Sequence, residues 1–443
     1  MSTRQPDAAA GGRMRAPLLL AAMAALIVLE GLSSGWNGAL VILNMGLISA
    51  VIALGLNMQW GYAGLFNSGV VGFIALGGLA PVLVSMQPTE GAFAAGGWGV
   101  LIALAILAVT LAAAIWLNRR LRGKAKAAAM IAVLIAGFFL YRAVFDPAVV
   151  AIQAINPASQ GYLGGLGLPV LLSWPLGAAL AALAAWGVAK TALGLRSDYL
   201  AIATLGIGEI IVAVLRNEEW LDRGVLNVTG IPRPWPVPYE VDLQADPAFV
   251  QRMTDWGIDP VTGSTVLVKL LYTGLFGLVL AVILLGAQLA LKSPWGRMMR
   301  AIRDNEISAA AMGKNVTGRH LQIFMLGAAV IGLGGAMMIT LDGQMTPSSY
   351  NPLRYTFLIL VMVVVGGSGN NWGSVLGAVL IWFVWIKAEV WGPTIMHLVT
   401  APLPDGALRQ HLQDSAPHMR VIIMGLILLL VLRFSPRGLL PEK

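Results

Sequence analysis

The chain has 443 residues, of which 58% are hydrophobic and 11% are charged, and its formal net charge at pH 7 is +8. Soluble domains usually carry about a quarter charged residues, so this composition excludes a disordered chain and argues against a soluble globular enzyme. The sequence contains no cysteine, which excludes disulfide bonds, thiolate nucleophiles and cysteine-ligated metal sites.

Apolar runs of membrane-spanning length follow one another along the chain. A spanning helix needs about 20 mostly apolar residues. The sequence therefore predicts an all-α fold, a polytopic transmembrane helical bundle with about 10–12 spans. The runs are 17–34, 39–57, 68–86, 96–117, 127–145, 169–188, 199–215, 266–291, 320–341, 355–366, 373–388 and 419–432. The tenth and twelfth runs are short, so either could be a half-helix or a re-entrant segment buried in protein.

The first apolar run follows Arg13 and Arg15, a pattern shared by signal peptides and by retained first helices. No small-x-small cleavage site follows Leu29, so we expect the helix to be retained. The predicted organisation is an N-terminal tail of residues 1–16, a transmembrane domain of residues 17–432 and a C-terminal tail of residues 433–443.

Charged residues lie in the loops and predict the orientation of the chain. The 118–126 loop has five basic residues and no acidic one, and the 292–319 loop has six basic and two acidic residues. Both loops and the basic tail should be cytoplasmic under the positive-inside rule. The 216–265 loop has eight acidic residues and four arginines, so it should face outward. Twelve spans with both termini in the cytoplasm satisfy these assignments, and charge clusters of this kind do not indicate a nucleic-acid partner.

The segment after Ser293 is basic and amphipathic. Helical spacing directs Met299, Ile302 and the pair Ala309–Ala310 toward one side, whereas arginines recur every three residues on another side and Gly313 should end or bend the helix. Such a segment can lie on anionic lipid headgroups or dock into a soluble partner. Composition leaves both interpretations open.

The same segment resembles a known family. Glu306-x-x-Ala309-Ala310-x-x-Gly313 is similar to the E-A-A…G cytoplasmic loop of ABC-importer permeases, and the longer run from Gly296 resembles the branched-chain amino acid permeases, in particular their LivM-type subunit. Further blocks agree in order along the chain: Gly55-Leu-Asn57…Gly61-Tyr-Ala-Gly-Leu65, Asp198-Tyr-Leu-Ala-Ile-Ala-Thr-Leu205, Gly208-Glu-Ile210, Thr229-Gly-Ile-Pro232, Val365-Gly-Gly367…Gly373 and Pro436-Arg-Gly-Leu439. The region 87–168, with its extra apolar hairpin, and the loop after Pro232 are longer than the family pattern.

The resemblance implies a subunit of a multi-subunit importer in the bacterial inner membrane. Its partners would be two ABC ATPase subunits, a second related permease and a periplasmic or extracellular solute-binding protein. The chain would bind no cofactor, because its partners would use ATP and Mg²⁺, and neither Gly123-Lys124 nor Gly313-Lys314 completes a phosphate-binding P-loop. On this resemblance, a helix over residues 297–317 would transmit the motion of the ATPases to the spans. The residues expected to couple the chain to the ATPases are Arg297, Arg300, Arg303, Asp304, Glu306, Ala309, Ala310 and Gly313.

Polar residues inside apolar runs are candidates for the translocation pathway. Asn57, Tyr62 and Asn67 lie among glycines, where a broken helix could expose backbone amides to a carboxylate. The alternative is a short polar cytoplasmic turn between spans. Glu209 is an acidic residue well inside an apolar run, and it could line the pathway or form an interhelical hydrogen bond or ion pair.

The predicted function is a permease for branched-chain amino acids that is not itself an enzyme. Within the same family, urea, short amides or other amino acids are alternative solutes. An ion-coupled secondary transporter is an alternative of a different class, although Glu209 is nearly alone as a candidate for an ion or proton relay. A channel would need a filter motif that the sequence does not clearly contain.

Overall fold

The computed structural model describes residues 8–157 and 160–442, with side chains from residue 16 onward. Residues 1–7 of the predicted N-terminal tail, residues 158–159 of the long 87–168 region and residue 443 of the predicted C-terminal tail lie outside the described residues.

Each of the twelve predicted apolar runs overlaps one helix. These helices are α1 (Ala8–Ser34), α2 (Trp36–Asn57), α3 (Val70–Ser85), α4 (Trp98–Arg120), α5 (Gly123–Gln153), α6 (Ser173–Ala192), α7 (Ser197–Asn217), α11 (Pro260–Lys292), α14 (Val316–Asp342), α15 (Leu358–Gly366), α16 (Asn371–Thr400) and α18 (Met419–Phe434). Within the described residues, ten helical segments are long and apolar enough to cross a membrane. The predicted all-α, polytopic bundle is therefore confirmed.

Shorter elements connect these helices. The short α-helices are α8 (Glu219–Asp222), α9 (Glu240–Ala245), α10 (Pro247–Asp255), α12 (Pro294–Asp304), α13 (Glu306–Ala311) and α17 (Ala407–Asp414). The π-helical turns are η1 (Met58–Tyr62), η2 (Phe93–Gly97) and η6 (Leu353–Phe357), and the 3₁₀ turns are η3 (Val170–Leu172), η4 (Gly224–Leu226), η5 (Pro347–Ser349) and η7 (Ala416–His418). Strands β1 (Val228–Thr229) and β2 (Gln344–Met345) pair antiparallel, with Val228 opposite Met345.

The short spans differ in part from the prediction. The tenth run is short as expected, because its apolar helix covers only Leu353–Gly366. The twelfth is not short, since its helical segment continues over 19 residues from Ala416 to Phe434. The third is short instead: the chain around Gly64 and Gly69 is not helical, so α3 begins only at Val70.

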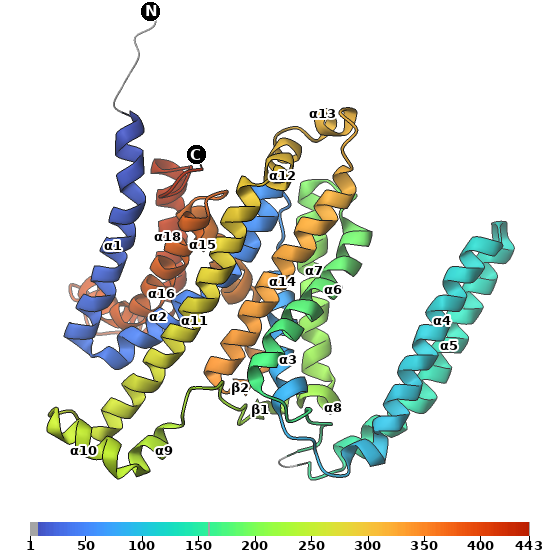
Figure 1. Ribbon diagram of the computed structural model, residues 1–443, viewed down its shortest axis with the longest axis horizontal. Coiled ribbons are helices and arrows are strands. Elements are labelled where there is room, and N and C mark those ends of the chain that lie inside the picture. Colours follow the sequence, from blue (N-terminus) through green and yellow to red (C-terminus); the bar gives the residue numbers. More distant parts are fainter. Residues whose placement is uncertain (1–7, 158–159, 443) are drawn as a thin grey trace, which may run out of the picture.

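The bundle has two chemically different ends (Figure 1). Helices α12 and α13 lie at the same end as the start of α1 and the last described residues of the chain, whereas α8, α9, α10 and the β1–β2 pair lie at the opposite end. The basic 292–319 loop and the acidic 216–265 loop are therefore on opposite ends, as the charge pattern predicts.

Helices α2, α14 and α16 form the buried centre of the bundle. Close approach of backbones holds this centre together: a Cβ atom on Gly77 of α3 would lie only 1.9 Å from the carbonyl oxygen of Gly332 in α14. Small residues permit such van der Waals packing where lipid removes the hydrophobic driving force between helices. At the periphery, Glu30 of α1 forms a buried ion pair with Lys387 of α16, so α1 is packed into the bundle.

The predicted extra hairpin is formed by α4 and α5, and it projects away from the bundle (Figure 1). Most of its apolar side chains are exposed. Its attachment is a small cluster near α8, in which the rings of Phe145 and Trp220 pack edge to face with centroids 5.8 Å apart.

Candidate coupling and translocation site

Helix α12 is fixed at its start by local chemistry. Pro294 occupies the first turn, and the Ser293 hydroxyl accepts a hydrogen bond from the amide of Gly296 at 3.3 Å. Both features are typical of a helix N-terminus. Met299 and Ile302 are buried on one face, whereas Arg297 is exposed. The predicted amphipathic face is confirmed for this helix.

The segment is not the single helix over 297–317 that the pattern predicts. Asn305 is extended, with φ of −157°, and its side chain accepts a hydrogen bond from the amide of Ser308 at 2.9 Å. Asparagine favours such an N-cap over continuation of a helix, so α13 starts anew at Glu306. Ala309 is buried but Ala310 is exposed, contrary to the prediction. Gly313 has φ of 75° and ends the helical segment, as expected.

Helix α13 presents apolar side chains to its surroundings. Ile307 is 83% exposed and Met312 at its C-terminal end is 79% exposed. Figure 1 shows α13 beyond α12, at the tip of this end of the bundle. Glu306 and Asp304 are exposed beside them. The tip of this segment is therefore available for contact, whereas α12 is packed on its own chain.

Arg303 connects α12 to the bundle. Its Nη1 donates hydrogen bonds to the carbonyl oxygen of Gly61 in η1 and to Glu442 Oε2, the latter at 2.8 Å, and its Nε donates to Asp304 Oδ1 at 3.2 Å. Burial disfavours the charged guanidinium, but the hydrogen bonds and charges of Glu442 and Asp304 outweigh it and raise the pKa of Arg303. The side chain is therefore a fixed, charged link between three segments.

The backbone that Arg303 contacts belongs to a buried polar network. Asn57 Oδ1 accepts from the amide of Gly369 at 2.8 Å, and Asn57 Nδ2 donates to Asn371 Oδ1 at 3.2 Å. The hydroxyl of Tyr62 also donates to Asn371 Oδ1. Asn57 and Tyr62 have no exposed surface. The network joins the end of α2 to the turn between α15 and α16.

A second set of hydrogen bonds extends from the same stretch toward α14 and α3. Gln59 Nε2 donates to the carbonyl oxygen of Phe324 at 2.8 Å, and Asn67 Nδ2 donates to Gln59 Oε1 at 2.8 Å. Asn67 Oδ1 accepts from the amide of Gly69 at 2.8 Å. Gln59 and Asn67 are fully buried. In this conformation these residues are buried and hydrogen-bonded between helices, and they do not form an exposed polar turn.

The structure thus brings together residues that the sequence places far apart. Asn57, Tyr62 and Asn67, predicted for the pathway, lie in the same buried region that Arg303 of the predicted coupling segment contacts. The site residues predicted from the sequence do not include Asn371 and Glu442, which also belong to this region. The Gly366-Gly-Ser-Gly-Asn-Asn371 run offered a signal for Asn371, whereas nothing in the sequence indicated a partner for Glu442.

Glu209 is not part of this network. It lies in α7, where the neighbouring Gly208 packs against Gly72 of α3: a Cβ on Gly72 would lie 2.8 Å from Gly208 Cα. Glu209 Oε1 is buried without a hydrogen-bond partner, and no ion pair involves Glu209 in the part of the chain that the structure describes. The predicted interhelical partner is therefore not seen in this conformation.

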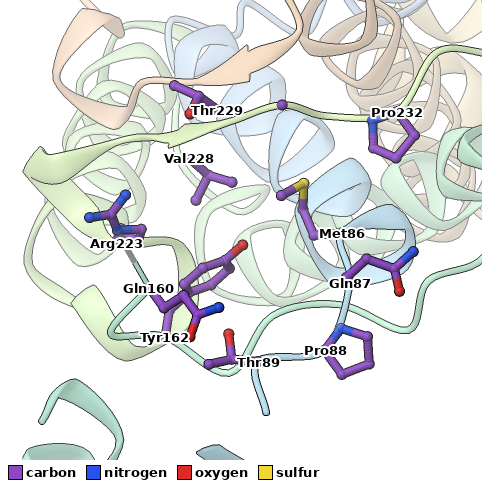
Figure 2. Close-up of a pocket in the computed structure, with 11 residues that line it drawn as sticks. Met86, Gln87, Pro88, Thr89, Gln160, Tyr162, Arg223, Val228, Thr229 and Pro232 are labelled. Carbon is purple, nitrogen blue, oxygen red and sulfur yellow. The ribbon is translucent and has the colours of Figure 1, made fainter. Parts of the chain in front are cut away.

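A separate cavity of about 260 Å³ lies at the opposite end of the bundle. Figure 2 shows Met86, Thr89, Tyr162 and Val228 around it, and Arg223 lies at its edge. Burial raises the pKa of Tyr162, so its hydroxyl stays neutral. The cavity is built from three connecting segments, and no motif in the sequence predicts it. Over the described residues, no cluster of three or more acidic or histidine side chains could hold a metal ion.

Known proteins resemble this chain over most of its length. A family model described as "Branched-chain amino acid transport system / permease component" matches residues 125–432. The chain is 28% identical over 291 residues to the high-affinity branched-chain amino acid transport system permease protein LivM of Salmonella typhimurium, and 27% identical over 291 residues to that of Escherichia coli. Each of these matches covers 66% of this chain and 61% of the relative.

A third relative matches over a longer part. The probable branched-chain amino acid transport permease protein LivM of Methanocaldococcus jannaschii is 23% identical over 399 residues, which cover 89% of this chain and 90% of the relative. No solved structure matches the chain.

Proposed function

Because the chain belongs to the family of branched-chain amino acid transport system permease components, we propose that it is the membrane-spanning permease subunit of an ATP-driven importer for branched-chain amino acids. It is a multi-pass membrane protein. We place it in a bacterial inner membrane, with both termini and the α12–α13 end in the cytoplasm. The names of its three relatives and the clustering of basic loops at that end support this proposal.

The exposed side chains of α13 support the proposed ATPase partner. Ile307 and Met312 are exposed at the tip of the segment, beyond α12. Apolar side chains that project past the bundle support a protein partner rather than lipid headgroups. We assign this surface to an ATPase subunit, one of two in the complex, while a second permease and an external solute-binding protein complete the importer. ATP and Mg²⁺ belong to the ATPases.

The main support for coupling is the connection from this surface to the bundle interior. Movement of α13 displaces α12, whose Met299 and Ile302 are buried against the chain. Arg303 then transmits the displacement to η1 through the carbonyl oxygen of Gly61. Because η1 continues α2, the central helix, a small shift there changes how helices pack around Asn57 and Asn371. Packed interfaces switch between discrete arrangements, which suits alternating access.

The decisive experiment is reconstitution in liposomes. The chain alone should neither hydrolyse ATP nor accumulate leucine, whereas the complete set of subunits should do both, and excess urea should not compete. Accumulation of leucine by the chain alone on an ion gradient would establish a secondary transporter instead. Preference for urea over leucine in the complete system would keep the importer and change its solute.

Glu209 is proposed to line the pathway. Its buried and unpartnered Oε1 is a costly group inside a spanning helix, so it should be retained for a role in another conformation or with solute present. Glu209→Gln should lower leucine uptake at least about threefold while the subunits still assemble. Gly206→Ala is a matched control on the same helix, because no atom lies within 4 Å of its added Cβ. Unchanged uptake in Glu209→Gln would remove the pathway role.

A further inference from the structure

A second cavity lies beside the coupling segment, at the level where three spanning helices end. Its volume is about 370 Å³. Ala16 at the start of the α1 span, Lys292 at the end of α11 and Trp372 in the first turn of α16 all line it. At these positions the apolar spans end and more polar sequence begins, which is the level at which lipid headgroups lie. The cavity is therefore at the membrane surface and not in the centre of the bundle.

The cavity is cationic. Lys292 and Arg300 line it, and neither forms an ion pair within residues 16–157 and 160–442. Arg300 Nη2 makes only a long contact, 3.5 Å, with the carbonyl oxygen of Leu291. The acidic side chain at the cavity, Glu442, is held by Arg303 at 2.8 Å. Its charge is therefore largely balanced, and two positive charges remain available to a ligand.

A buried donor at the cavity also lacks a partner. Asn371 is 1% exposed, and its Oδ1 accepts hydrogen bonds from Asn57 and Tyr62. Its Nδ2 has no hydrogen-bond partner among the described atoms, although the residue lines the cavity. A buried, unpaired amide donor costs free energy unless an acceptor reaches it. An oxygen-rich anion in the cavity would satisfy it.

We propose that this cavity binds the phosphate group of an anionic molecule, and that the headgroup of an anionic phospholipid supplies it. Two basic side chains and an amide donor match the oxygens of a phosphate, and basic pockets between spanning helices are typical sites for anionic headgroups. Trp372 is 43% exposed, and tryptophan is common at the membrane–water interface, where the headgroup joins the acyl chains. The proposal is independent of the transported solute.

The test uses the full chain purified in detergent. Phosphatidylglycerol and phosphatidylcholine with identical acyl chains are titrated, and binding is followed by native mass spectrometry and by the shift in Tm. Phosphatidylglycerol should bind more tightly and raise Tm. Lys292→Gln and Arg300→Gln should each weaken its binding about fivefold. Arg433→Gln, an exposed basic residue at the end of α18 outside the cavity, is the matched control and should leave binding unchanged.

Inorganic phosphate is titrated separately to distinguish the source of the anion. Binding of inorganic phosphate that depends on Lys292 and Arg300, with no preference between the two lipids, would support the site and assign it to free phosphate. The proposal is overturned if neither probe binds through these residues, or if Arg433→Gln weakens phosphatidylglycerol binding as much as Lys292→Gln. Lys292 is exposed, so its variant should fold, and its Tm without lipid verifies this.

Discussion

Helices α12 and α13 are neighbours in sequence, but they are held in opposite ways. Helix α12 is joined to the bundle by buried Met299 and by the hydrogen bonds of Arg303, while its Ile302 packs with Ala309 and Val316 in a small separate cluster. Helix α13 is joined mainly through Ala309, and its Ile307 and Met312 are exposed. The difference supports the proposed coupling, in which the exposed helix would receive the ATPase and the buried helix would pass its movement to the spans.

Arg303→Glu should have the largest effect, because it removes the donor to Gly61 and places two carboxylates together at Glu442. We expect the free energy of unfolding to fall by about 2 kcal/mol and leucine uptake to fall more than about tenfold. Arg433→Glu, at an exposed position near the end of α18, is the control for charge alone. Thermal unfolding and uptake by the complete importer measure both. An equal loss in the two variants would mean that the link to Gly61 is unimportant.

Gly61→Ala tests the receiving side of the same link. The added Cβ would lie 2.3 Å from Asn57 Oδ1 and 2.5 Å from the amide nitrogen of Gly369, so the network must shift. Such overpacking costs about 1–3 kcal/mol. Gly274→Ala in α11 is the matched control, since no atom lies within 4 Å of its Cβ. Equal unfolding temperatures for both variants would show that the close packing around Gly61 tolerates change.

Ile307→Ser combined with Met312→Ser tests the exposed helix. We expect the free energy of unfolding to stay within about 0.5 kcal/mol, because both side chains are exposed. The amount of ATPase subunit that co-purifies should nevertheless fall several-fold. Ile302→Ser on α12 should behave in the opposite way and destabilise the fold, since Ile302 is 1% exposed. Full retention of the ATPase in the double variant would contradict the proposed docking surface.

A separate effect on stability alone is expected at the opposite end of the bundle, where the fold responds to pH. Burial raises the pKa of Asp222 from 3.8 to about 7, against the hydrogen bond that Asp222 accepts from Gly224. Between these values the folded chain holds a proton that the unfolded chain releases. Stability should therefore fall as pH rises from about 4 to about 7, by at most about 1.4 kcal/mol per pH unit.

Asp222→Asn should remove this slope without changing the effect of Arg303→Glu. Hydrogen exchange of residues 218–226 between pH 5 and pH 8 measures the local pH response. Leucine uptake measures the effect of Arg303→Glu. A slope that survives in Asp222→Asn would assign the pH response to another group. A change in the Arg303→Glu effect would mean that the two ends of the bundle are coupled.

Much of the fold follows from local pattern. The twelve apolar runs predict the spanning helices, because hydrocarbon requires each backbone group to be paired within its own helix. The family resemblance stated from the 296–313 run is confirmed by the family match. The single helix predicted over 297–317 is wrong, because the capping side chain of Asn305 overrides a periodicity that continues through it. Ala310 is exposed for the same reason.

The sequence by itself determined the class of protein, the number of apolar segments and the opposite charges of the two ends, since these depend on composition and on neighbours along the chain. Only the tertiary structure decided that Arg303 meets Gly61 and Glu442, and that Asn57 meets Asn371 more than three hundred residues away. Such contacts depend on how the helices pack. A buried polar group pairs with whichever partner the packing brings close to it. The separation of two residues along the chain does not predict that pairing.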